Sequence, residues 1–257
     1  MLEKVLAAER FTVAAALTAI CILAWAYLAY MAWGMEHMQV GAAMVIMPNM
    51  ASWDVVDLLL VFAMWVIMMA AMMLPSAAPM ILMFVTLNRR RQAKQGPYVH
   101  TAAFVSGYLA VWTAFSALAT LAQWRLLEAR LVSPMMESAS PAFGGLLLIF
   151  AGAFQFSRLK HACLTKCRSP LSFIMTEWRD GASGAFAMGV RHGVYCAICC
   201  WLLMLLLFIF GVMNLLWIAV LAAFVLLEKT LPAVRGLSAT TGVVLIGWGM
   251  FVPWLSG

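Results

Sequence analysis

Residues 185–210 read AFAMGVRHGVYCAICCWLLMLLLFIF, and this stretch decides the fold class. A helix needs about 20 mostly apolar residues to cross the hydrocarbon core of a membrane, and this stretch is long enough. Inside it, residues 192–200 read HGVYCAICC, with one imidazole and three thiols. The stretch therefore predicts a membrane-spanning helix that carries a chemically reactive motif.

The whole chain has the same apolar character. Of its 257 residues, 66% are hydrophobic and only 10% are charged, and its mean hydropathy is +0.98. Soluble globular domains are about 45–50% apolar and about 25% charged, so the composition excludes that class. Every backbone polar group in a bilayer core needs an internal partner, which favours helices. We therefore expect an all-α, polytopic bundle of transmembrane helices, with residues 1–257 forming one integral membrane domain in the lipid bilayer.

Seven apolar segments are predicted to span the membrane, and counts of six or eight are also compatible because two segments are short. The first, from Phe11, is longer than the apolar part of a secretion signal, so we expect it to be a retained span. Pro75 and Pro79 interrupt the second, whose continuation to Leu87 is expected to be a bent helix end. The predicted spans are residues 11–33, 55–74, 99–124, 142–157, 185–210, 213–231 and 237–255.

The lysines and arginines test this topology independently. With the N-terminus in the cytoplasm, 13 of them lie in inside segments, Arg125 and Arg130 lie outside, and Arg191 lies at the mouth of the fifth span. Orientation follows the Lys/Arg bias, so we expect a cytoplasmic N-terminus. The net charge of +6 then reflects orientation, and no nucleic-acid partner is expected. The inside residues are Lys4, Arg10, Arg89, Arg90, Arg91, Lys94, Arg158, Lys160, Lys166, Arg168, Arg179, Lys229 and Arg235.

The motif HGVYCAICC places its ligand-type side chains near one face of the predicted helix. Residues three and four apart share a face, which relates His192 to Cys196 and Cys196 to Cys199 and Cys200. Because Cys199 and Cys200 are adjacent, a set of three ligands that uses only one of them is easier to build than a set of four. The alternative is that these cysteines pack as small apolar residues, as we expect for the isolated Cys21.

A second cluster precedes this motif. Residues 161–167 read HACLTKC and supply His161, Cys163 and Cys167, at a spacing that suits either one helical turn or a short chelating loop. Thiolates and imidazoles bind Cu(I), and they also suit Zn(II). The gathering of five of the six cysteines into two motifs that each hold a histidine favours metal or redox chemistry over packing. Whether the two clusters form one site is left open by the sequence.

Thirteen of the 21 methionines lie between Met31 and Met83. On the outer side, Met35, His37 and Met38 form a candidate soft-metal site, because a thioether binds Cu(I) without losing a proton. Methionines at four-residue steps in the second span would present thioethers along one side of a helix. For these we favour packing, because methionine fills irregular gaps in cores.

Ionisable residues within spans are costly, and each is a functional hypothesis. Arg191 and His192 lie inside the fifth span and need partners. Glu228 is expected to be a solvated residue at the cytoplasmic end of the sixth span, paired or not with Lys229.

Three blocks of the sequence resemble an uncharacterised bacterial family of predicted metal-binding integral membrane proteins, catalogued as a domain of unknown function. The likeness covers roughly residues 55–230 and is most specific in GVRHGVYCAICCW, where the family has glycine at the position of Ile198. It implies metal binding and a place in the bacterial cytoplasmic membrane. The blocks read MWVIMMAAMMLPSAAPMI, WRDGASGAFAMGVRHGVYCAICCWLLM and LFIFGVMNLLWIAVLAAFVLLEK.

Functions of different classes fit these observations. The first is handling of a soft metal ion, most concretely Cu(I), for uptake, retention or delivery to a partner protein or membrane complex. ATP-driven pumping is not expected, because the chain lacks the motif GxxxxGK[ST], and the sequence leaves enzymatic activity open. The second is a thiol–disulfide oxidoreductase that uses Cys196 and Cys199, although disulfides persist poorly in the cytoplasm. The third is a structural subunit whose thiols only pack.

Overall fold

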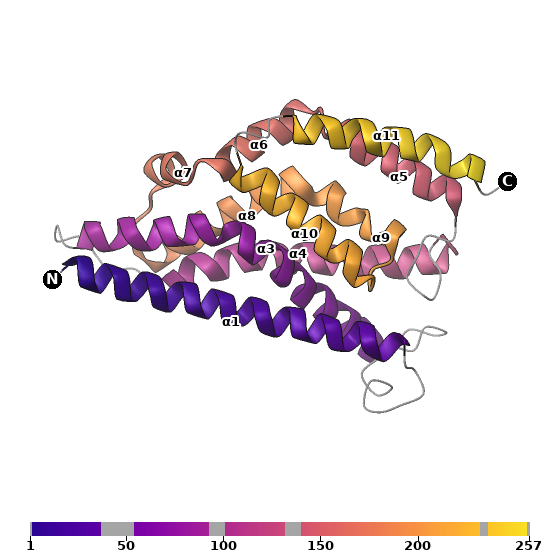
Figure 1. Ribbon diagram of the computed structural model, residues 1–257. Coiled ribbons are helices and arrows are strands. Elements are labelled where there is room, and N and C mark those ends of the chain that lie inside the picture. Colours follow the sequence, from indigo (N-terminus) through magenta and orange to yellow (C-terminus); the bar gives the residue numbers. More distant parts are fainter. Residues whose placement is uncertain (1, 37–53, 93–100, 132–139, 232–235, 256–257) are drawn as a thin grey trace.

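The computed structural model describes residues 2–36, 54–92, 101–131, 140–231 and 236–255, and every regular element in these ranges is a helix. The all-helical prediction is therefore confirmed for this part of the chain. Figure 1 shows a bundle in which α1 begins at one end and α11 finishes at the other. The helices are α1 (Leu2–Glu36), α3 (Val55–Gln92), α4 (Thr101–Glu128), α5 (Pro141–Phe154), α6 (Arg158–Arg168), α7 (Pro170–Glu177), α8 (Gly181–Leu205), α9 (Leu207–Phe210), α10 (Leu215–Thr230) and α11 (Leu237–Leu255).

Among the described residues, four helical segments are long and apolar enough to cross a membrane. They are α1, α3, α4 and the run from α8 into α9, and a fifth is counted if α5 and α6, which meet at 63°, form one bent span. The 16 residues of α10 and the apolar part of α11, Leu237–Val252, fall short of the about 20 residues that a span needs. The seven-span count and the cytoplasmic N-terminus stay predictions.

Helix α3 runs through both of its prolines and extends to Gln92, so the expected continuation beyond residue 74 is confirmed. A proline inside a helix lacks the N–H that would bond the carbonyl four residues earlier, and α3 changes direction near its middle (Figure 1). In this turn the Oγ of Ser76 donates a hydrogen bond to the carbonyl of Met73 at 2.9 Å. The irregular turn therefore brings polar groups to the middle of an apolar helix.

Helices α4 and α8 approach each other closely because glycines lie at their contact. A Cβ on Gly107 of α4 would lie 2.1 Å from the carbonyl oxygen of Phe186, and one on Gly189 of α8 would lie 2.0 Å from that of Phe104. No side chain fits at these distances, so the contact requires glycine on both helices. This seam sets the position of α8, the helix that carries HGVYCAICC.

Helices α6 and α10 complete the surroundings of α8. Helix α6 packs against α8, and α10 packs against α3. Each begins with a side-chain cap: Ser157 Oγ accepts from the N–H of Lys160 at 3.1 Å, and Asn214 Oδ1 accepts from the N–H of Trp217 at 3.4 Å. Helices α5 and α11 lie side by side at the edge of the bundle (Figure 1). The buried region enclosed by α3, α6, α8 and α10 is where the thiols lie.

Candidate metal centre

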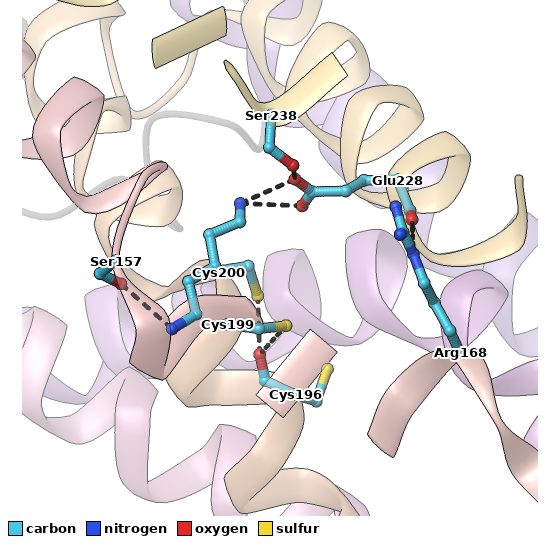
Figure 2. A network of polar contacts seen from close by, with 8 residues as sticks. Ser157, Arg168, Cys196, Cys199, Cys200, Glu228 and Ser238 are labelled. Atoms are coloured by element: carbon cyan, nitrogen blue, oxygen red, sulfur yellow. Dashed lines mark hydrogen bonds and ion pairs between the residues drawn. The ribbon is translucent and has the colours of Figure 1, made fainter. Parts of the chain in front are cut away.

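The three cysteines of the α8 motif are buried. The Sγ of Cys199 donates to the carbonyl oxygen of Cys196 at 3.1 Å, and the Sγ of Cys200 donates to the same oxygen at 3.0 Å. These contacts follow from helix geometry, since a side chain can reach back to the carbonyl three or four residues earlier. The sulfur of Cys196 itself points away from this carbonyl (Figure 2). It is therefore directed toward other elements.

The sulfur of Cys196 contacts polar groups from two other helices, and these groups are held in turn by α3. Lys229 Nζ of α10 lies 2.7 Å from it, and Tyr108 Oη of α4 lies 3.1 Å from it. The same ammonium donates to Ser76 Oγ of α3 at 3.1 Å, and Tyr108 Oη donates to the carbonyl of Met73 at 3.2 Å. The irregular turn of α3 is thus part of the surroundings of Cys196.

The seven residues of the HACLTKC cluster form about two turns of α6. Cys163 and Cys167 lie four residues apart on its buried side, and the thiol of Cys167 lies close to that of Cys199 of α8. Cys199 and Cys200 in turn lie near Cys196, whose carbonyl oxygen accepts from both of their thiols. His161 is exposed on the other side of α6. Thiols from the two sequence motifs therefore meet, whereas His161 does not join them.

His192 is buried among aromatic rings. Its ring centroid lies 5.5 Å from those of Tyr108 and Phe173 and 6.2 Å from that of Phe104. Its Nδ1 has no hydrogen-bond partner among the residues that the structure describes. The neighbouring Arg191 does have the partner that we expected it to need, because its guanidinium lies 2.7 Å from the carboxylate of Glu177. In the described part of the chain, His192 therefore offers an unpaired nitrogen in the interior, whereas the charge of Arg191 is already compensated.

Glu228 is buried, and the expectation that it is solvated is wrong. Its carboxylate lies 2.8 Å from Nζ of Lys160, which is itself fully buried, and accepts a hydrogen bond from Ser238 (Figure 2). The Nε of Arg168 donates to its backbone carbonyl at 2.7 Å. Lys160 of α6 and Ser238 of α11 thus surround the carboxylate at the end of α10. Glu228 thus ties α6, with its two thiols, to α10.

Several predicted metal ligands lie away from these thiols or outside the residues that the structure describes. Met35 lies near the end of α1, and its side chain is outside the described part of the chain, as are His37 and Met38. The α3 methionines that follow one another at four-residue steps are buried in the core, which agrees with the interpretation that they fill space in the packing. The buried α3 methionines are Met64, Met68, Met69, Met72 and Met73.

The sequence reasoning missed the groups around Cys196 that come from other helices. From the sequence, Lys229 is a basic residue of the inside segments and a neighbour of Glu228, and neither Tyr108 nor Ser76 is singled out. One signal for Lys229 was present in the sequence: Glu228 and Lys229 directly follow an apolar run, with no polar turn before them. Ionisable residues within a span are functional candidates, so this pair could have been singled out. Nothing in the local pattern of Tyr108 or Ser76 marks them, since tertiary packing brings them to the thiol.

The donor chemistry of this cluster suits a soft monovalent ion. Thiolate sulfur selects soft ions such as Cu(I) and Zn(II), and a tetrahedral zinc site wants four nitrogen or sulfur ligands. Within the described ranges, no three side chains of His, Cys, Asp or Glu are arranged to hold one ion. The six cysteines are all free thiols. A pair of sulfurs is therefore the simplest ligand set that this region offers.

Comparison with known proteins agrees with this chemistry. A family model described as PpoB2, copper chaperone, matches residues 62–252, which include all the thiols of α6 and α8 and both Glu228 and Lys229. Neither a curated protein nor a solved structure matches the chain. This match supports the resemblance to a metal-binding family and indicates that the metal is copper. Since the match spans most of its length, the chain belongs to the PpoB2 family of copper chaperones.

Proposed function

We propose that this protein is a membrane-embedded copper chaperone that holds Cu(I) on its buried thiols and delivers it to a partner protein. The observation that carries this proposal is the gathering of thiols from α6 and α8 in one buried region, at Cys167, Cys199, Cys200 and Cys196. They are buried together inside the segment that matches the copper chaperone family. Copper is here the cargo of the protein.

Burial of the ligands suits the handling of Cu(I). A thiol site closed to water protects a bound Cu(I) ion from oxidation and from competing ligands. Transfer then needs a second set of soft ligands that approaches the site. The thioethers of α3 supply candidates, because Met73 lies at the turn whose carbonyl contacts Tyr108 beside Cys196. We propose that these methionines pass Cu(I) between the thiols and the Met35, His37 and Met38 segment.

The long apolar helices support a place in the bacterial cytoplasmic membrane. In the proposed orientation, the N-terminus lies in the cytoplasm and the methionine-rich segment lies outside. Copper collected by thioethers outside would bind more tightly to thiolates inside, because an anionic sulfur is the stronger donor. The receiving partner is a copper-dependent protein or a subunit of a membrane complex.

Metal titration of the purified full-length protein in detergent tests this proposal. Wild-type protein is expected to take Cu(I) from a chromophoric chelator, and a Cys196→Ser, Cys200→Ser double variant is expected to lose that ability. Cys21→Ser is the matched control, because Cys21 is a free thiol in α1 that joins neither thiol motif. Equal Cu(I) binding by the wild type and the double variant would contradict the proposal.

A further inference from the structure

The two charged residues near the end of α10 point to different parts of the interior. Glu228 accepts from Lys160 of α6, and that pair is fully buried. Lys229 is only 7% exposed, and its ammonium contacts Cys196 Sγ and Ser76 Oγ. Among the described residues, Lys229 has no carboxylate within ion-pairing distance. Its two contacts are therefore a neutral hydroxyl and a thiol.

A buried ammonium is unfavourable unless an anion lies beside it. Glu228 carries one negative charge, and the ammonium of Lys160 already compensates it. The serine hydroxyl brings no charge to Lys229. The sulfur of Cys196 is then the group that can carry the compensating negative charge, because a neighbouring cation stabilises a thiolate. Lys229 and Cys196 thus form one charge-compensated pair, beside the pair of Lys160 and Glu228.

We propose that Lys229 makes this thiol site selective for a monovalent soft cation over a divalent one. The inference rests on the proposed function, because it assigns the charge of the ion that the same thiols hold. It names Lys229 as a positioning and selecting residue that acts through Cys196 and does not bind the metal.

The selection follows from counting charges around two sulfur ligands. A monovalent ion on two thiolates has a net charge of minus one, and the ammonium of Lys229 brings the buried unit to zero. A divalent ion on the same two thiolates is already neutral, and Lys229 would be left as an uncompensated buried cation. A divalent ion would need a third thiolate to reach neutrality. The described residues present no three-ligand arrangement that would supply it.

Removal of the charge on Lys229 tests this inference. In purified full-length protein, the affinities for Cu(I) and Zn(II) would be measured by competition with chromophoric chelators. Lys229→Leu removes the charge without adding a group that binds a metal. It is expected to lower the ratio of Cu(I) to Zn(II) affinity by at least about tenfold, because a charge at hydrogen-bonding distance in a buried site interacts strongly.

Two matched variants separate charge from packing. Lys229→Arg retains the cation and is expected to keep most of the wild-type affinity ratio. The double variant Lys160→Leu, Glu228→Gln removes a buried ion pair of zero net charge and is expected to leave the ratio unchanged. An unchanged ratio in Lys229→Leu, or an equal fall of the ratio in the double variant, would overturn the inference.

A measurement on the wild-type protein tests the inference without requiring that any variant folds. X-ray absorption of the protein loaded with Cu(I) is expected to show two sulfur scatterers, and three or more sulfur ligands would overturn the inference. If Lys229→Leu does not fold, Lys229→Gln is judged by the same affinity ratio. Cu(I) binding with an unchanged ratio leaves the proposed function intact, whereas a wild type that binds no Cu(I) overturns both.

Discussion

Glu228 and Lys229 are neighbours in sequence, yet their side chains serve different clusters. The carboxylate of Glu228 joins Lys160, and the ammonium of Lys229 joins Cys196. Because successive helix residues are separated by about 100°, neighbours point in different directions. One dipeptide can therefore hold α6 through its first residue and neutralise the α8 thiols through its second.

At the residue scale, we expect Glu228→Ala to destabilise the protein strongly. The change leaves the ammonium of Lys160 buried without its carboxylate, and breaking a buried ion pair costs about 3–5 kcal/mol. Denaturation in detergent would measure the loss in the free energy of unfolding. Glu128→Ala is the control, since Glu128 forms an exposed pair with Arg125 that contributes only about 0–1 kcal/mol. Similar small effects for both variants would show that the Glu228 pair is not a buried anchor.

The sequence predicted the thiols of this region but not the charges beside them. Helical spacing and composition marked Cys196, Cys199 and Cys200, because their pattern is local. The burial of Glu228 depends on α6 and α11 covering the end of α10, and no local pattern reports such a contact. A charged residue after an apolar run therefore looked like an ordinary solvated end.

At the element scale, α8 depends on its glycine seam with α4. The helix carries the thiols, so its depth and rotation decide whether Cys196 reaches Lys229 and Tyr108. The apolar runs predicted that α8 and α4 exist, and the same reasoning predicted the continuation of α3 past Pro75. Sequence reasoning did not predict the break between α5 and α6, where the expected fourth span to residue 157 instead stops at Phe154 and Ser157 caps a new helix.

Gly189→Ala is expected to disturb the seam and the site together. The added methyl group would lie 2.0 Å from the carbonyl oxygen of Phe104, so α4 and α8 must separate. Overpacking of this kind costs about 1–3 kcal/mol, and we expect a lower midpoint of thermal unfolding together with weaker Cu(I) binding. Gly247→Ala in α11 is the control, because an added methyl group there has no neighbour within 4 Å. Equal behaviour of the two variants would contradict a constrained seam.

At the scale of the whole molecule, the arrangement of charges predicts which face of the bundle meets the cytoplasm. Basic residues gather in the segments at the start of α1, the end of α3, α6 and the end of α10. Lys/Arg bias sets orientation, so these segments are predicted to lie inside. The lengths of α10 and α11 do not by themselves decide whether those helices span a membrane, which is why composition alone does not settle the span count.

Epitopes inserted into the full-length protein test the predicted topology. An epitope after residue 96 is expected to be accessible to antibody only in permeabilised cells. Epitopes after residue 135 and at the C-terminus are expected to be accessible from outside, because seven spans with a cytoplasmic N-terminus leave the C-terminus outside. Outside accessibility at residue 96 would reverse the orientation, and a protected C-terminus would exclude an odd number of spans.

The copper content of the protein isolated from copper- and zinc-replete cells tests the central claim most directly. We predict about one copper per chain by elemental analysis, as expected for one soft two-thiolate site. The Cys196→Ser, Cys200→Ser double variant should lose this copper, and Cys21→Ser should retain it. Wild-type protein that contains no copper, or a double variant with as much copper as the wild type, would contradict the account.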